Sequence, residues 1–159
     1  GCGPGKTALD FKKARKYIGI DISQRCIKNA KRNFSNYGDF YCFSIDNLDE
    51  GPLANISNID LVIMKGVYHH LSDKEITNLL GKLKHKLSKN GKVISLDPTY
   101  INGHLISNFI ASTDRGVFIR KGNYLLDILS RQMRVVSKEI IKQKFPPYQR
   151  ILIQLGNDS

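Results

Sequence analysis

The chain opens on three alternating glycines, Gly1-Cys2-Gly3-Pro4-Gly5, ahead of a short segment with helical character. Glycine permits tight turns and lets a ligand approach the backbone where a Cβ would block it. The amides at a helix start can in addition face a carboxylate or another anion. The opening is therefore a candidate ligand-binding turn, although a flexible glycine loop explains it equally well when it is taken alone.

A carboxylate, Asp21, ends the apolar run that begins at Tyr17. An acid at the end of the strand that follows a glycine turn can accept hydrogen bonds from both hydroxyls of a ribose. Ile20 or Ile22 would then give the sugar or its base an apolar wall. The alternative is that Asp21 caps the helix beside Ser23. Glycine turn, helix, strand and terminal acid in this order are more specific than any one part.

Asp46 and Asn47 follow the next strand candidate. A carboxylate can accept a hydrogen bond from the exocyclic amine of an adenine, and a neighbouring backbone amide can donate to a ring nitrogen. Ile45 would pack on the base. A plain Asx turn explains these residues almost as well.

A histidine-rich loop lies between a strand candidate and a capped helix. Ligands of open α/β sheets bind beyond the carboxyl ends of the strands, so Lys65 and Gly66 would lie along the ligand. Tyr68, His69 and His70 are the candidate catalytic residues, because a histidine there can remove a proton from a hydroxyl or an amine. The alternative for each histidine is packing at the helix start, and adjacent histidines do not by themselves make a metal site.

The elements around these residues alternate between strand and helix, which predicts a parallel sheet covered by helices. Strands are expected at 17–21, 40–45, 59–64 and 92–97, and helices at 6–14, 24–37, 73–87, 103–113 and 122–132. Two β-rich runs, 134–143 and 148–155, predict an antiparallel pair that closes the sheet.

The 159 residues suit one soluble α/β domain, expected to span 1–159, and no apolar run predicts insertion into a membrane. The odd set Cys2, Cys26 and Cys42 favours free thiols in a reducing, cytoplasmic setting. The formal charge of +11 admits a nucleic-acid partner. We favour a lysine-rich solvated surface, because few aromatic residues interleave with the positive charges.

Together these motifs, which span roughly residues 1–98, resemble class I (Rossmann-like) S-adenosylmethionine-dependent methyltransferases. The matching segments are Gly1–Gly5 for the glycine motif, Tyr17–Ser23 for the second strand with its ribose-binding acid, Asp60–Met64 with Val67–Leu71 for the fourth strand and its loop, and Asn90–Ile94 for the turn into the fifth strand. A looser match, Asp114–Arg120, is similar to small-molecule-type members of the family.

The resemblance implies a three-layer sandwich around a mostly parallel sheet, S-adenosylmethionine as cofactor and S-adenosylhomocysteine as product. It implies the following cofactor contacts: the carboxylate and sulfonium near Gly1, Cys2, Gly3 and Gly5, the ribose at Asp21 beside Ile22, the adenine near Asp46 and Asn47, and the methionine part along Lys65 and Gly66. In the family a central strand precedes the glycine motif. We therefore expect an N-terminally incomplete domain whose natural chain has residues before Gly1.

The expected reaction is methyl transfer to an oxygen, nitrogen or carbon nucleophile of a small molecule, and it requires no metal. The candidates for the acceptor pocket are Tyr100, His104, Arg115, Arg120 and Tyr124. The arginines would suit an acidic or phosphorylated acceptor, but surface salt bridging explains them equally well.

Three alternatives remain open at the level of sequence. Gly5-Lys6-Thr7 matches the end of a P-loop, with Val93–Asp97 as the strand that carries a magnesium-binding acid. A nicotinamide-binding fingerprint fits less well, because Lys6 occupies the place of its third glycine. The fold can also serve a non-catalytic module that binds the cofactor or nucleic acid.

Overall fold

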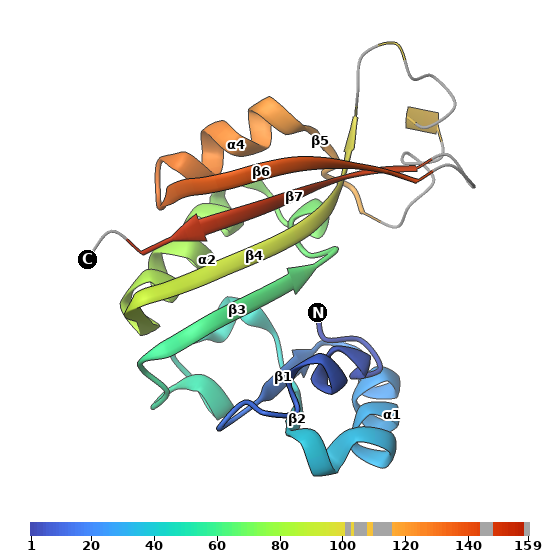
Figure 1. The fold of residues 1–159 in the computed structure, drawn as a ribbon, viewed down its shortest axis with the longest axis vertical. Coiled ribbons are helices and arrows are strands. Elements are labelled where there is room, and N and C mark those ends of the chain that lie inside the picture. Colours follow the sequence, from blue (N-terminus) through green and yellow to red (C-terminus); the bar gives the residue numbers. More distant parts are fainter. Residues whose placement is uncertain (101–102, 104–107, 110–115, 144–147, 158–159) are drawn as a thin grey trace. The chain divides into compact units, whose positions relative to one another are not determined.

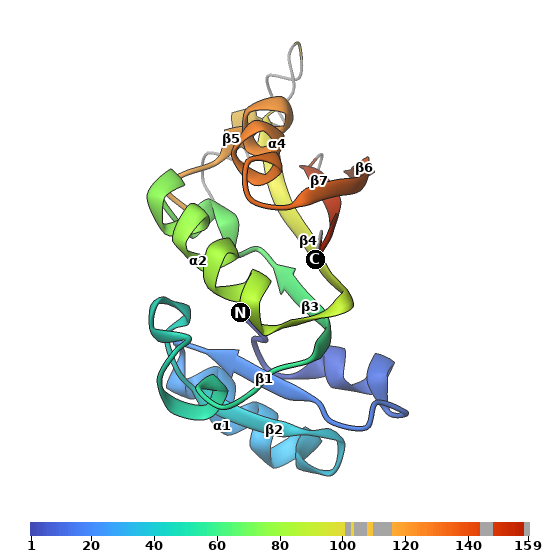
Figure 2. The same cartoon turned by 90° about the vertical axis from the view of Figure 1, so that its left-hand side faces the viewer.

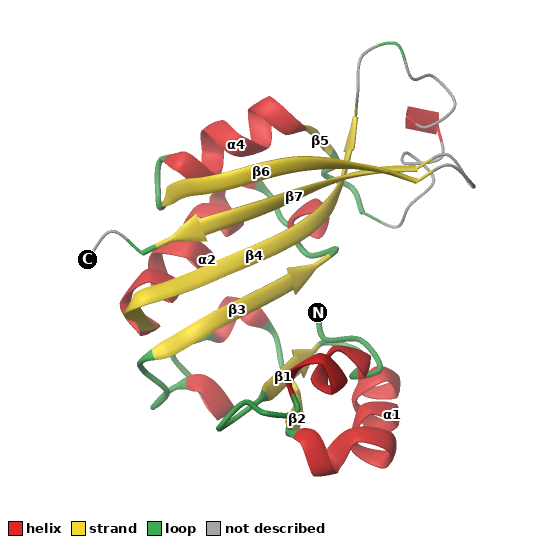
Figure 3. Ribbon diagram, in the orientation of Figure 1, coloured by secondary structure: helices red, strands yellow, loops and turns green. Residues whose placement is uncertain are grey.

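The structure is a computed structural model that describes residues 1–100, 103, 108–109, 116–143 and 148–157. The chain forms two compact units, unit 1 (Gly1–Asn55) and unit 2 (Ile56–Ser159) (Figures 1 and 3). Unit 1 contains η1 (Lys6–Phe11), β1 (Ile18–Asp21), α1 (Gln24–Phe34), η2 (Ser35–Tyr37), β2 (Asp39–Cys42), η3 (Ile45–Asn47) and η4 (Gly51–Leu53). Unit 2 contains β3 (Ile59–Lys65), η5 (Tyr68–His70), α2 (Asp73–Lys86), β4 (Leu87–Tyr100), β5 (Arg120–Lys121), α4 (Gly122–Ser130), β6 (Arg134–Gln143) and β7 (Tyr148–Gly156).

Unit 1 is built on the parallel pair β1–β2, in register from Ile18↔Asp39 to Asp21↔Cys42. Helix α1 begins where the Ser23 hydroxyl accepts a hydrogen bond from the Cys26 amide at 3.3 Å, as expected of an N-cap. Its apolar residues pack on β2 and η1 in one small core made of Ala8, Ile27, Ala30 and Phe40. This core holds α1 against β2 and η1.

Several elements of unit 1 are shorter than the sequence suggests. The helix expected over 24–37 ends at Phe34, where the 3-10 helix η2 follows. The helix expected over 6–14 is a 3-10 helix that ends at Phe11. The strand expected over 40–45 ends at Cys42, because the Ser44 side chain accepts from the Asp46 amide and starts the turn η3. Local side-chain hydrogen bonds of this kind compete with strand pairing.

Unit 2 has one sheet in the order β3-β4-β7-β6, with β5 paired to β4. Strands β3 and β5 run parallel to β4, whereas β7 is antiparallel to both β4 and β6. The predicted mixture of parallel strands and an antiparallel C-terminal hairpin is thereby confirmed. Helices α2 and α4 lie on the same face of this sheet (Figure 2). Their buried side chains and those of the sheet form the core of unit 2: Ile76, Leu79, Leu80, Leu83, Val93, Leu125, Ile128, Leu129, Ile151, Ile153 and Leu155.

Strand β4 begins earlier than expected, at Leu87 and not at Lys92. Ile59 pairs with Leu87 while Leu61 pairs with Lys92, so the residues between Leu87 and Lys92 form a bulge. A Cβ on Gly91 would lie 2.7 Å from the Ile59 carbonyl oxygen, which explains why a glycine stands there. The capping box Ser72–Glu75 at the start of α2 is present as predicted. The helix expected over 103–113 lies mostly outside the described residues.

None of the helices in the described part of the chain combines the length and the apolar character needed to cross a bilayer.

Candidate functional site

The opening turn of unit 1 is bonded directly to Asp21. The Gly3 amide donates to Asp21 Oδ2 at 2.8 Å, and the Ser23 amide donates to Asp21 Oδ1 at 2.8 Å. The Cys2 amide donates to the Ile20 carbonyl oxygen at 2.9 Å, which extends the contact between the turn and β1. The residues that the sequence paired as glycine turn and acid therefore meet. Asp21 also serves the helix start beside Ser23, which was the alternative role.

The surroundings of Asp21 fit a ribose, with an apolar protein surface beside it for the base. Each carboxylate oxygen has two lone pairs, and each accepts one of these backbone amides, so both can also accept from a sugar hydroxyl. A Cβ built on Gly3 would meet no atom within 4 Å, so the turn has open space at that point. Ile22, next to Asp21, is 78% exposed and gives an apolar surface of the kind a nucleoside base can cover.

The same contacts argue against a P-loop. A P-loop cradles phosphates with its backbone amides. Here the amides of Cys2, Gly3 and Gly5 donate within the protein, the last to the Cys2 carbonyl oxygen at 3.2 Å. The Asp21 carboxylate bonded to this turn would repel a phosphate.

Asp46 and Asn47 lie exposed in η3. The Ser44 hydroxyl donates to Asp46 Oδ2 at 2.9 Å, so a local turn of the kind considered as the alternative is present. Parallel pairing of Asp21 with Cys42 puts the carboxyl ends of β1 and β2 at one edge of their sheet, where the Phe43 amide donates to the Asp21 carbonyl oxygen at 3.0 Å. Residues 46 and 47 follow shortly after that edge.

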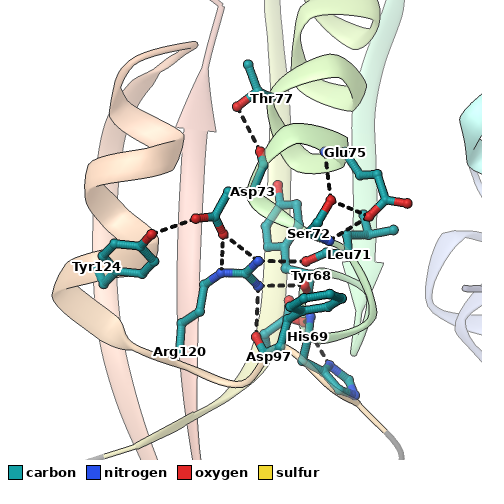
Figure 4. Close-up of polar contacts among 11 residues, drawn as sticks. Tyr68, His69, Leu71, Ser72, Asp73, Glu75, Thr77, Asp97, Arg120 and Tyr124 are labelled. Carbon is teal, nitrogen blue, oxygen red and sulfur yellow. Dashed lines mark hydrogen bonds and ion pairs between the residues drawn. The ribbon is translucent and has the colours of Figure 1, made fainter.

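A second set of chemically competent groups lies in unit 2 and centres on His69. Its Nδ1 lies 3.2 Å from Asp97 Oδ1, and its backbone amide donates to the same oxygen at 3.3 Å (Figure 4). Asp97, on β4, is 1% exposed and His69 is 6% exposed. The exposed His70 tilts its ring against His69, with the ring centroids 4.0 Å apart. The structure therefore brings His69 together with an acid that stands 28 residues away in the sequence.

Tyr68 and Lys65, which the sequence predicts to lie near these histidines at the ligand, differ in their exposure to solvent. Tyr68 is 1% exposed, and burial, with a smaller contribution from the Asp97 charge, raises the pKa of its hydroxyl well above the usual value. Its side chain therefore faces the interior of unit 2. Lys65 ends β3 with an exposed side chain, and the Gly66 amide donates to the Leu96 carbonyl oxygen at 2.8 Å.

Arg120, expected in an acceptor pocket, is instead a buried structural residue. A guanidinium has five N–H donors, and the five hydrogen bonds of this one go to Asp73 Oδ1 (from Nε and from one terminal nitrogen) and to the carbonyl oxygens of Tyr68, Leu71 and Phe118, at 2.6–3.0 Å. Tyr124 donates to Asp73 Oδ2 at 2.6 Å. That hydrogen bond and then the Arg120 guanidinium hold the pKa of Asp73 below its usual value. An anionic acceptor gains no free donor from Arg120.

The remaining acceptor candidates are less informative. His104 and Arg115 lie outside the described residues, and Tyr100 ends β4 with a half-buried side chain. Sequence reasoning missed the role of Asp97 as a partner of His69. Its one available signal was an acid at the end of the strand predicted over 92–97, as Asp21 ends the strand predicted over 17–21. Within the described ranges, no group of three or more His, Cys, Asp and Glu side chains could hold a metal ion.

The sequence of this chain is similar to the sequences of known proteins. Residues 1–91 match the family model of a methyltransferase domain. An uncharacterized methyltransferase of Anoxybacillus flavithermus is 28% identical over 124 residues, which are 75% of this chain and 54% of that protein. An uncharacterized protein of Methanocaldococcus jannaschii is 38% identical over 65 residues, which are 38% of this chain and 30% of that protein. The chain thus spans about half or less of these relatives.

Solved structures share the fold at low sequence identity. The N-methyltransferase NodS of Bradyrhizobium japonicum, crystallised with S-adenosyl-L-homocysteine, aligns with a TM-score of 0.76 at 13% identity, over 100% of this chain and 76% of NodS. The magnesium protoporphyrin IX methyltransferase of Synechocystis, also with bound S-adenosylhomocysteine, aligns with a TM-score of 0.72 at 18% identity, over 99% of this chain and 72% of that one. The predicted α/β fold is therefore confirmed. Because the family model covers more than half of the chain, this protein belongs to the methyltransferase domain family, as its resemblance to the class I enzymes predicted.

Proposed function

We propose that this chain binds S-adenosylmethionine and transfers its methyl group to an oxygen, nitrogen or carbon atom of a small molecule. The observation that carries the proposal is the Asp21 carboxylate bonded to the opening glycine turn, inside the segment that matches the methyltransferase family. The proposal concerns the whole protein, since the chain spans about half of its curated methyltransferase relative.

In unit 1 we propose that the residues of the turn and the strand ends bind and orient the cofactor. Asp21 would accept from the ribose hydroxyls, with Ile22 as the apolar wall. Asp46 and Asn47 would recognise the adenine, and the turn Gly1-Cys2-Gly3-Pro4-Gly5 would hold the methionine end. The bound cofactor supplies a methyl group that its sulfonium makes electrophilic. The protein therefore mainly aligns two reactants, and good alignment can lower a barrier by about 7–11 kcal/mol.

In unit 2 we propose that Lys65 and Gly66 lie along the methionine part, and that His69 and His70 serve the acceptor side. His70 is exposed, so its imidazole can contact an acceptor, while His69 has a carboxylate partner of the kind that orients a basic imidazole. For the buried Tyr68 the proposed contribution is packing inside unit 2. The small-molecule class is supported by the fold likeness to an enzyme that acts on magnesium protoporphyrin IX.

Two wider proposals accompany this function. We propose that both units belong to one methyltransferase domain, because the family match over 1–91 crosses the boundary after Asn55. We also propose a cytoplasmic location, which the free thiols of Cys2, Cys26 and Cys42 support.

Calorimetry with S-adenosylhomocysteine and with ATP–Mg²⁺ tests the cofactor assignment. We expect S-adenosylhomocysteine to bind and ATP–Mg²⁺ not to bind. Asp21→Ala should weaken the binding of S-adenosylhomocysteine at least tenfold, because a charge-assisted hydrogen-bond acceptor for the ribose is lost.

Ser23→Ala is the matched control for Asp21→Ala. It removes the side-chain cap on Cys26 but keeps the backbone amide that donates to Asp21, so affinity should stay close to that of the parent chain. Equal affinities of the Asp21→Ala variant and the parent would show that the ribose assignment is wrong. Binding of ATP–Mg²⁺ alone would overturn the methyltransferase proposal.

A further inference from the structure

The carboxylate of Asp97 is buried at a point where it contacts His69 twice. Asp97 Oδ1 accepts from the His69 backbone amide and also lies in hydrogen-bond reach of Nδ1, and both side chains are more than nine-tenths buried (Figure 4). The contact with the backbone amide fixes the position of the His69 main chain. The contact with Nδ1 fixes the orientation of the imidazole ring. A surface ion pair would fix neither, because solvent competes and the side chains move.

The backbone around His69 restricts the same ring further. A Cβ built on Gly116 would lie 1.9 Å from His69 Cδ2, so the Gly116 main chain packs directly against the imidazole. A Cβ on Gly66 would lie 3.1 Å from Cε1. The Phe118 amide donates to the His69 carbonyl oxygen at 3.0 Å and ties that segment in place. The ring is therefore held by Asp97 at one nitrogen and by close main-chain contacts along its carbon atoms.

Arg120 holds the turn on either side of the histidine pair. Its terminal nitrogens donate to the Tyr68 carbonyl oxygen at 3.0 Å and to the Leu71 carbonyl oxygen at 2.7 Å. The carbonyl groups before and after His69 and His70 are thus bound to a side chain that Asp73 anchors in turn. Such support is what a group needs to act at a defined position.

An ionised carboxylate can only accept hydrogen bonds, so its contact with Nδ1 requires the proton on that nitrogen. Nε2 then carries the lone pair. We propose that Asp97 is a positioning residue that fixes His69 as the Nδ1–H tautomer and so makes Nε2 its basic nitrogen. This inference rests on the proposed acceptor-side role of His69.

In that role Nε2 takes the proton from the O–H or N–H of the acceptor, whose lone pair forms the new bond to the methyl carbon. The carbon–sulfur bond breaks and its electron pair stays on sulfur. The imidazolium that results keeps its Nδ1–H on Asp97, and the carboxylate stabilises its charge.

The tautomer can be measured without any acceptor or cofactor. Long-range ¹H–¹⁵N spectra of the chain labelled in its histidine rings distinguish a protonated nitrogen from one that carries a lone pair. The His69 signals are assigned by their loss in His69→Gln. In the parent chain, at a pH where the ring is neutral, we expect a protonated Nδ1 and an unprotonated Nε2.

Asp97→Ala should abolish this preference and give a ring that is mainly protonated on Nε2, as neutral imidazoles are in water. Ser95→Ala is the matched control, because Ser95 is equally buried on β4 two residues earlier and should leave the His69 tautomer unchanged. A parent chain with the proton on Nε2 would overturn the inference even if the Asp97→Ala variant fails to fold. So would an Asp97→Ala variant that keeps the proton on Nδ1.

Binding of S-adenosylhomocysteine, measured on the same samples, separates this inference from the proposed function. If the tautomer depends on Asp97 in a chain that binds no S-adenosylhomocysteine, the methyltransferase proposal fails and the role of Asp97 stands. If the cofactor product binds but the tautomer does not depend on Asp97, the positioning role fails and the cofactor assignment stands.

Discussion

Single carboxylates organise the chemically competent parts of both units, and each does so by accepting backbone amides. Asp21 accepts from Gly3 and Ser23, and Asp97 accepts from His69. Hydrogen bonds to a carboxylate are stronger than bonds between neutral groups, so each acid fixes the main chain beside it. Under the proposed function, the residue that determines each turn is also the residue that binds or orients a reactant.

Gly3 and Gly5 both have positive φ angles, +54° and +86°, yet they should respond differently to substitution. Gly3→Ala should cost about 1–2 kcal/mol of unfolding free energy, because only backbone strain is added. Gly5→Ala should cost about 2–5 kcal/mol, because its Cβ would also lie 2.8 Å from Ala30 Cβ. Urea denaturation measures both.

Binding of S-adenosylhomocysteine to the Gly3→Ala variant tests the proposed function of the turn. The methyl group of the Gly3→Ala variant would enter the open side of the turn, where we propose that the cofactor lies, so this milder variant should lose affinity. A Gly3→Ala variant with unchanged affinity would argue that the turn does not contact the cofactor.

At the scale of elements, the Asp73–Arg120–Tyr124 contacts join the start of α2, the turn η5, strand β5 and helix α4 within unit 2 (Figure 4). The residues that take part come from two stretches of sequence, 68–73 and 118–124. Buried backbone carbonyl groups need donors, and here one guanidinium supplies them. The histidine pair therefore depends on elements that follow it by some 50 residues.

Arg120→Lys should destabilise the chain by about 2–5 kcal/mol. A lysine ammonium has three donors in another geometry and would leave buried carbonyl oxygens unpaired. Arg131→Lys is the matched control, since Arg131 bonds to Asp127 in an exposed i,i+4 pair that contributes about 0.5 kcal/mol or less. Equal urea midpoints for the two variants would contradict the structural role given to Arg120.

The lowered pKa of Asp73 predicts a pH dependence. A carboxylate whose folded-state pKa is lowered adds stability above its unfolded pKa of about 3.9, and this stability is lost as the pH falls through the folded value. Tyr124→Phe removes the largest cause of the lowering, so it should reduce stability at pH 7. The difference in unfolding free energy between this variant and the parent chain should disappear as the pH falls below about 4.

Urea denaturation at a series of pH values measures the stability difference between the Tyr124→Phe variant and the parent chain. Asp73 is 46% exposed, so water screens its contacts and the difference should be small. A difference that stays constant down to pH 2 would mean that Tyr124 acts by packing and not through the charge of Asp73.

At the scale of the whole molecule, the net charge of +11 is compatible with the solvated surface expected from sequence. The structure adds two contacts that spacing did not suggest. Lys12 lies 5.3 Å from the ring centroid of Tyr37, and Lys31 lies 6.0 Å from that of Tyr41. Cation–π pairs of this kind stabilise a surface only modestly.

The elements that the sequence predicted well are those with a local cause. Ser23 and the Ser72–Glu75 box start their helices, because capping depends on residues three positions apart. The hairpin of β6 and β7 follows from two β-rich runs separated by a short connection. Strand ends were less accurate at Cys42 and Leu87, where a local turn or a bulge sets the end.

The sequence by itself determined the family, the order of the elements and the pairing of the glycine turn with Asp21, because these follow from residue type and short-range spacing. Only the tertiary structure decided that Asp97 contacts His69, that Tyr68 is buried, and that Arg120 bonds to Asp73 and to backbone carbonyl groups. Those contacts join residues 28–52 positions apart. Such partners are set by strand register and by the packing of helices on the sheet, which no local pattern encodes.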